Sequence, residues 1–193
     1  MNTKKVKLIA GIGMLTAVAV ILQYIEIGLP FMPGFIKLDF SDLPCLIGAF
    51  AYGPFAGVGI AFLKNVIHMT VSQSGFVGEL SNFVLGSILA FTAGIIYKYK
   101  KTKKNAVAAA LSGSAMMAAL SVPLNNIIIY PLYYYVMGLP KQSILDMYRL
   151  ILPSVRTIPQ ALLIFNAPFT LAKGILCSVI ALLIYKPLTK ILK

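Results

Sequence analysis

The sequence contains very few acidic residues and few groups that could carry out chemistry. Among its 193 residues there are five Asp and Glu, one His, two Cys and no Trp, and only 11% of the residues are charged. A soluble domain has roughly one quarter of its residues charged, so this composition argues against a soluble protein. Hydrophobic residues make up 59% of the chain, which indicates a protein solvated by lipid.

The sequence also lacks the short motifs of common catalytic and metal centres. It has no Gly-x-x-x-x-Gly-Lys-Ser/Thr loop for ATP phosphates, no His-Glu-x-x-His and no Cys-x-x-Cys. No Ser, His and acid trio is recognisable, although such a trio need not be close in sequence. Cys45 and Cys177 lie in apolar surroundings, where buried free thiols are expected. We therefore predict no enzyme activity, no metal and no cofactor, and any ATP-driven step requires a partner.

Lysine is the abundant charge, and its distribution predicts an orientation. Eleven of the fifteen lysines fall into three clusters, and all five acids lie between those clusters. Lysines that flank apolar spans mark the cytoplasmic side, so both termini and the 98–104 loop are predicted to be cytoplasmic. This placement accounts for the net charge of +12 without nucleic acid as a partner. The clusters are Lys4, Lys5 and Lys7; Lys98, Lys100, Lys101, Lys103 and Lys104; and Lys186, Lys190 and Lys193.

Apolar runs divided by Pro, Gly or charge predict an all-α integral membrane protein, with one bundle of six transmembrane helices. Two cytoplasmic termini require such an even number of helices. We expect residues 1–193 to form a single substrate-binding domain, with no internal repeat. The predicted helices span about 6–27, 41–53, 54–71, 79–99, 105–136 and 156–190, and the predicted outer loops span about 28–40, 72–78 and 137–155.

The last predicted helix carries a polar stripe deep in the membrane. Placing a Lys at the centre of a membrane span costs about 2.5–3.5 kcal/mol on insertion scales, so a Lys there is expected to have a partner or a function. Lys173 lies seventeen residues after Arg156 and thirteen before Lys186, far from either end of the span. Asn166, Thr170 and Lys173 share one helix face, which we expect to line a cavity. A structural ion pair between Lys173 and an acid across the bundle is the alternative.

Other polar groups within the spans allow two interpretations each. Asn125 either binds a ligand or joins two helices by a hydrogen bond. Glu79 and Asn82 share a face at the outer end of the fourth helix, where Glu79 is either a ligand contact or a partner for the helix dipole. Lys64 is expected to pair or to snorkel. The tyrosines at 133–135 are expected to form an interfacial belt.

The first predicted helix carries a stripe of small residues. Ala10, Gly13 and Ala17 lie along one side of it, where another helix can approach closely. This stripe is a candidate docking surface for a partner protein. Packing within its own bundle is the alternative.

Five short segments follow one another along nearly the whole chain. None of them is specific alone, but their succession resembles the riboflavin-specific substrate-binding (S) components of energy-coupling factor transporters. The segments are Lys37–Pro44, Leu63–His68, Gly78–Asn82, Asn125 ahead of Tyr130–Tyr133, and Pro168–Gly174.

The resemblance implies a subunit that captures riboflavin from the outer side of a bacterial cell (inner) membrane without changing it chemically. It implies a vitamin site near the outer leaflet, closed by the loop after the first helix, and docking through the first helix. It also implies that transport needs a transmembrane coupling protein and two ATPase subunits. Membrane lipid is the remaining expected partner.

The resemblance also implies which residues bind the vitamin. Asn125 and Lys173 match family positions that contact the isoalloxazine ring. The family motif reads Pro-Phe-Asn-x-x-Lys, so Thr170 stands where an Asn is expected, and Asn166 is placed to replace it. The complete predicted ligand-binding set is Leu38, Asp39, Glu79, Asn82, Asn125, Asn166, Thr170 and Lys173.

Three alternative functions remain open at this point. The chain could bind another vitamin, such as thiamine or a pterin, because many flat aromatic ligands suit an apolar site with a few polar groups. It could be a stand-alone secondary carrier, although many such carriers contain internal repeats and this chain has none. A membrane-embedded enzyme would be distinguished by a product that differs chemically from the bound ligand.

Overall fold

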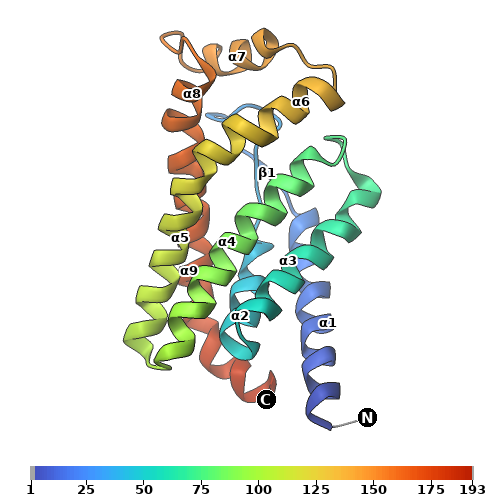
Figure 1. Ribbon diagram of the computed structural model, residues 1–193, viewed down its shortest axis with the longest axis vertical. Helices are drawn as coiled ribbons and strands as arrows, with labels where there is room; N and C mark the ends of the chain where they lie inside the picture. Colours follow the sequence, from blue (N-terminus) through green and yellow to red (C-terminus); the bar gives the residue numbers. More distant parts are fainter. Residues whose placement is uncertain (1–2, 193) are drawn as a thin grey trace.

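The structure is a computed structural model that describes residues 3–192, without the side chains of Lys4 and of residues 186–192. In this part, the chain forms a bundle of helices with one short β-hairpin (Figure 1). The orienting lysines Lys4, Lys186, Lys190 and Lys193 were predicted from the sequence, and their side chains lie outside the described residues.

The helical architecture agrees with the prediction of an all-α protein. Two π-helical segments join α5 to α6 and α8 to α9, so each pair runs as one interrupted helix. A short 3₁₀ segment, η1 (Met69–Val71), follows α3. The elements are α1 (Thr3–Tyr24), β1 (Ile27–Gly28), β2 (Lys37–Leu38), α2 (Asp42–Tyr52), α3 (Pro54–His68), α4 (Val77–Tyr99), α5 (Lys103–Leu124), η2 (Asn125–Ile129), α6 (Tyr130–Val136), α7 (Lys141–Arg149), α8 (Ile158–Ala161), η3 (Leu162–Asn166) and α9 (Ala167–Leu192).

Five helical stretches of the described chain are long and apolar enough to cross a membrane. Helix α2 has only 11 residues, about 17 Å at 1.5 Å per residue, and a hydrocarbon core is about 30 Å thick. It packs against α3, α4 and α9 inside the bundle. The even number of spans and the cytoplasmic position of the termini therefore stay predictions.

Local sequence explains where several helices begin. Gly53 has φ = 104°, a conformation that favours glycine, and Pro54 then occupies the first turn of α3. The Thr102 side chain accepts a hydrogen bond from the backbone N–H of Asn105 and caps α5. Thr157 caps α8 in the same way. These signals make the turns at 53 and near 102 predictable.

The two π-helical segments have a common local cause. Each ends two residues before a proline, Pro131 after η2 and Pro168 after η3. Proline lacks an N–H and its ring clashes with the carbonyl four residues earlier, so a wider turn relieves the conflict. The sequence predicted continuous helices over 105–136 and 156–190, and the structure corrects this with an interruption in each.

The predicted outer loops also contain regular structure. The first helix ends at Tyr24, before the predicted 27, and β1 and β2 then pair antiparallel, with Ile27 opposite Leu38. Within 137–155, α7 forms because Ile144, Leu145 and Tyr148 fall on one face and become buried. This i, i+1, i+4 pattern is typical of an amphipathic helix, and the helix was not predicted within the loop.

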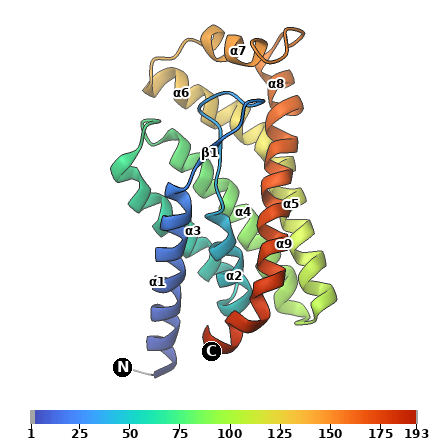
Figure 2. The same ribbon diagram turned by 180° about the vertical axis from the view of Figure 1, so that it is seen from behind.

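The two termini of the described chain lie at the same end of the bundle, together with the turn between α4 and α5 (Figure 1). The hairpin, α6 and α7 lie at the opposite end, as the reverse view also shows (Figure 2). One apolar core joins α1–α5 and α9, and a second joins α6, α7, α8 and η3. This arrangement brings segments from both halves of the chain together near the hairpin.

Candidate ligand-binding site

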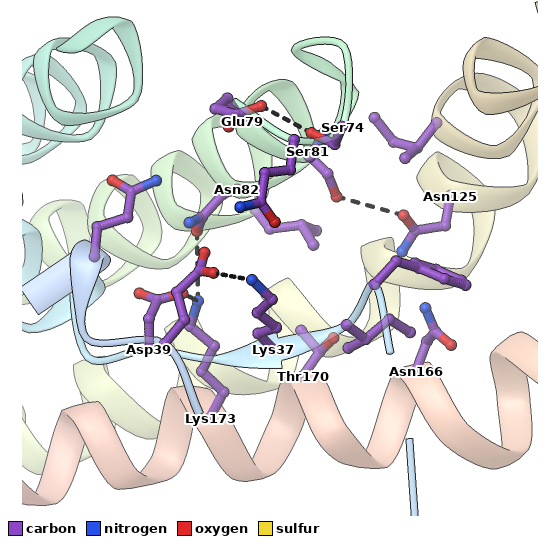
Figure 3. Close-up of a pocket in the computed structure, with 18 of the residues that line it drawn as sticks. Lys37, Asp39, Ser74, Glu79, Ser81, Asn82, Asn125, Asn166, Thr170 and Lys173 are labelled. Atoms are coloured by element: carbon purple, nitrogen blue, oxygen red, sulfur yellow. Dashed lines mark hydrogen bonds and ion pairs between the residues drawn. The ribbon is translucent and has the colours of Figure 1, made fainter. Parts of the chain in front are cut away.

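A cavity of about 690 Å³ lies beside the hairpin and receives side chains from α1, α3, α4, η2, η3 and α9. This volume falls within the usual range of about 300–1,000 Å³ for small-molecule pockets. Seven of the eight predicted ligand-binding residues line it (Figure 3): Asp39, Glu79, Asn82, Asn125, Asn166, Thr170 and Lys173. Leu38 is paired with Ile27 in the hairpin and is not among the lining residues. That the seven lining residues bind a ligand stays a prediction.

Lys173 occupies the floor of the cavity in an ion-paired state. Its Nζ lies 2.8 Å from Asp39 Oδ2 and 3.2 Å from Asp42 Oδ2. It also donates a longer hydrogen bond, 3.4 Å, to Asn82 Oδ1 (Figure 3). Both interpretations of Lys173 therefore hold, since the residue lines a cavity and forms an ion pair across the bundle.

A second buried lysine lies beneath this floor. Lys64 of α3 is 0% exposed, donates to Asp42 Oδ1 at 2.8 Å and also bonds the Ser41 hydroxyl. It does not line the cavity. Two lysines and the carboxylates of Asp39 and Asp42 thus form a neutral cluster, which offsets the cost of burying each charge. Pairing, rather than snorkelling, is the outcome for Lys64.

Asp39 pairs with Lys173 in this charged cluster and lies just after the hairpin. Its Oδ1 accepts a hydrogen bond from the backbone N–H of Ser41 at 2.9 Å. Burial acts to raise the pKa of Asp39, but Lys173 and Lys64 outweigh burial and hold the pKa well below its usual range. The carboxylate is therefore ionised and ties the chain after β2 to α9.

Glu79 is held at another wall by side chains rather than by the helix dipole alone. Its Oε1 lies 3.0 Å from His68 Nδ1, and its Oε2 accepts hydrogen bonds from Ser72 and Ser74 at 2.8 and 2.9 Å. Here the carboxylate lies between the hydroxyls and the imidazole. In a nucleophilic triad the imidazole lies between the hydroxyl and the acid, so these residues are not arranged as a triad.

The two π-helical segments present an asparagine each to the cavity. Asn125 is the first residue of η2 and Asn166 the last of η3, and both are buried. Ser81 donates to Asn125 Oδ1 at 3.4 Å, and Tyr148 donates to Asn166 Oδ1 at 2.6 Å. Asn125 thus joins two helices by a hydrogen bond and lines the cavity, and its role in ligand binding stays a prediction. Thr170, one turn beyond Asn166, is 5% exposed and lines the same wall.

Several lining residues were not predicted from the sequence. Tyr133 was assigned to an interfacial belt with its neighbours, but it is 6% exposed and lines the cavity, whereas Tyr135 is 86% exposed. Aromatic identity alone does not distinguish a residue of an interfacial belt from one that lines a pocket. The helical position would have done so, because Tyr133 lies two turns beyond Asn125 and therefore on the same side of the helix. The other unpredicted lining residues include Gln23, Phe35, Lys37, His68 and Tyr130.

The hairpin contributes part of the cavity wall. Phe35, Ile36 and Lys37 line it, and Lys37 Nζ lies 2.5 Å from Glu26 Oε2. Phe35 packs against the rings of Tyr130 and Tyr133, with centroids 6.3 and 5.7 Å apart. The result is a site with aromatic walls and a few directed polar groups, which suits binding of a small, partly apolar molecule.

Comparison with known proteins gives one family. The family described as "ECF transporter, substrate-specific component" matches residues 7–185. The riboflavin transporter RibU of Staphylococcus aureus is 32% identical over 193 residues, covering 100% of this chain and 96% of that protein. The riboflavin transporter FmnP of Bacillus subtilis is 29% identical over 184 residues, covering 94% and 91%.

Structural similarity agrees with the sequence matches. A solved structure reported under "Structure and mechanism of the S component of a bacterial ECF transporter" has a TM-score of 0.76 and 31% identity, covering 98% of this chain and 99% of that chain. The resemblance inferred from the five segments is thereby confirmed, and the family consists of transporter components rather than enzymes. The chain belongs to the substrate-specific components of ECF transporters.

Proposed function

We propose that this chain is the riboflavin-binding subunit of an ATP-driven vitamin importer. The observation that carries the proposal is the 690 Å³ cavity, in which Asn125, Asn166 and Lys173 meet beside aromatic walls. A flavin is flat and apolar at one end and carries several carbonyl and nitrogen acceptors at the other, which suits amide and ammonium donors. The names of the two relatives, both riboflavin transporters, support the same ligand.

The ribityl chain of riboflavin would need polar partners beyond the ring. Glu79, His68 and Ser74 line the cavity on the side of α3 and α4, away from the asparagines of η2 and η3. Carboxylate and imidazole acceptors can each take a hydrogen bond from a ribityl hydroxyl. The proposed pose places the ring between η2 and α9 and the ribityl chain toward Glu79.

Energy for transport would come from partners, a coupling protein in the membrane and two ATPase subunits. The small-residue stripe of α1 supports docking there, because Ala10, Gly13 and Ala17 are all exposed. A Cβ added to Gly13 would meet nothing within 4 Å. Packing within the bundle uses another face of α1, where Gly11 contacts Tyr52. The stripe therefore suits a partner helix in close contact.

The proposed location is a bacterial cell membrane, with the termini and the 98–104 turn in the cytoplasm. The hairpin lies toward the opposite end of the bundle from these segments (Figures 1 and 2), and its residues 34–37 line the cavity, which is consistent with capture of the vitamin from outside. Anchoring by Lys98, Lys100 and Lys101 follows the positive-inside rule.

Purification in detergent followed by an absorption spectrum tests the proposal directly. The protein is expected to carry flavin absorbance, or to gain it with quenching of flavin fluorescence when riboflavin is added. Absence of binding to riboflavin, with binding to thiamine or a pterin, would overturn the ligand assignment. Uptake by this chain alone in vesicles without ATPases would instead favour a secondary carrier.

A further inference from the structure

Three buried polar groups close a triangle beside the cavity, where α6, α7 and η3 meet. The hydroxyls of Tyr130 and Tyr148 lie 2.5 Å apart, and Tyr148 Oη lies 2.6 Å from Asn166 Oδ1. Asn166 Nδ2 lies 3.3 Å from Tyr130 Oη. Tyr130 and Asn166 line the cavity, whereas Tyr148, which is 0% exposed, does not.

The direction of every hydrogen bond in the triangle follows from its geometry. A separation of 2.6 Å is typical of O–H···O and short for N–H···O, so Tyr148 donates to the carbonyl oxygen of Asn166. Tyr148 has only one proton, so the bond between the two hydroxyls is donated by Tyr130. Tyr130 then accepts from Asn166 Nδ2. Burial raises the pKa of Tyr148, which keeps this donor protonated.

The triangle fixes the orientation of the Asn166 amide. Its oxygen is taken by Tyr148, and one of its two N–H groups is directed to Tyr130, which leaves the second N–H for the cavity. Asn125 is oriented similarly, because its oxygen accepts from Ser81. Figure 3 shows the nitrogens of Asn125 and Asn166 on the sides that face each other.

We propose that Tyr148 is a positioning residue that sets ligand specificity by holding the Asn166 amide with its N–H toward the cavity. The inference rests on the proposed function, in which this wall meets the flavin ring. With Lys173, once its long 3.4 Å bond to Asn82 is exchanged for one to the ligand, the wall presents N–H donors from three elements. It favours a ring edge that carries acceptors, such as the carbonyls and ring nitrogens of a flavin. A ring edge that carries amino groups would place its own N–H donors against the N–H donors of the wall, which disfavours binding.

A double-mutant cycle separates positioning from a merely structural role. Tyr148→Phe removes the hydroxyl and keeps the ring, and we expect riboflavin to bind about three- to tenfold more weakly. In an Asn166→Leu background the same change should alter the dissociation constant less than about twofold, because the group being positioned is gone. Tyr134→Phe, a hydroxyl deletion outside the triangle, is the matched control and should bind as wild type.

A second comparison tests the amide orientation itself. Asn166→Asp keeps an oxygen for Tyr148 but presents oxygen instead of N–H to the ligand. Riboflavin should therefore bind Asn166→Asp more weakly than Asn166→Leu, with both proteins melting cooperatively in detergent. Tighter binding by Asn166→Asp would overturn the proposed orientation.

The outcomes also separate this inference from the function on which it rests. Riboflavin binding by the wild type, with additive effects of Tyr148→Phe and Asn166→Leu, would overturn the positioning role alone. Wild-type protein that binds no riboflavin would overturn the proposed function and this inference together. Coupled effects with an unaffected Tyr134→Phe control would support both.

Discussion

Lys173 Nζ lies 2.8 Å from Asp39 Oδ2, although the two residues are 134 positions apart in the sequence. This ion pair joins the segment after the hairpin to the second turn of α9, and it lies on the cavity floor. Because both groups are almost fully buried, each charge depends on the other. The segment between β2 and α2 is therefore electrostatically coupled to helix α9.

Replacing Lys173 should damage both stability and binding. Lys173→Met leaves Asp39 without its nearest cation and removes a cavity donor, and removing one partner of a buried pair costs about 3–5 kcal/mol. Melting temperature in detergent and riboflavin titration would measure the two losses. The double variant Lys173→Met with Asp39→Asn should recover stability but not affinity. Lys103→Met, at the opposite end of the bundle, is the control; an equal effect there would contradict a specific role.

Replacing Lys64 should have a different effect from replacing Lys173 in the same assays. It neutralises Asp42 but does not line the cavity. Lys64→Met is therefore expected to lower the melting temperature as strongly as Lys173→Met, while the folded fraction keeps riboflavin affinity within a few-fold of wild type. If Lys64→Met abolished binding in protein that remains folded, the cluster would have to act on the ligand as one unit.

Gly86 should tolerate no side chain, because α4 approaches Asp42 closely there. A Cβ at this position would lie 2.5 Å from Asp42 Oδ1 and disturb the buried cluster. Gly86→Ala is expected to destabilise by more than about 1 kcal/mol, the usual scale of disrupted core packing. At Gly59 nothing lies within 4 Å, so Gly59→Ala should be neutral or slightly stabilising in thermal melts. Equal effects at both positions would contradict the close contact.

Bulk on the small-residue stripe of α1 should block transport and leave binding intact. Gly13→Leu with Ala17→Leu adds side chains to an exposed face that touches no part of the cavity. Uptake of labelled riboflavin by cells should fall to background, and the purified variant should titrate as wild type. Val18→Leu enlarges a neighbouring exposed position and is the control. Undiminished uptake by the double variant would place partner docking elsewhere.

Strong acid should destabilise the protein through Asp39. Its pKa in the folded protein is lowered from the ordinary value of 3.8 by the lysines that outweigh burial. The stabilisation is therefore complete above that ordinary value and is lost as the pH falls through the folded pKa. The titration of Asp39 should leave the melting temperature unchanged down to about pH 5 and should lower it in stronger acid. Asp39→Asn should flatten this fall; an unchanged acid profile would implicate another group.

Much of the fold was predictable because it depends on local composition. Long apolar runs between Pro, Gly and Lys clusters predict membrane helices regardless of what they pack against, and Gly53-Pro54 marks a turn by backbone preference alone. The π-helical interruptions before Pro131 and Pro168 and the helix α7 were not predicted. Proline marks where a regular helix is disfavoured, but it does not tell how the preceding turn adapts. The burial of α7 depends on what packs against it, which the periodicity of one short segment cannot decide.

The sequence by itself determined that Lys173, Asn125 and Glu79 are polar groups in apolar surroundings, because burying such groups has a cost that demands a partner or a ligand. It did not decide which partner each one has. Only the tertiary structure pairs Asp39 with Lys173, Asp42 with Lys64, and Tyr148 with Asn166. These pairings act over a few ångströms between residues far apart in the chain, so they exist only once the helices have packed.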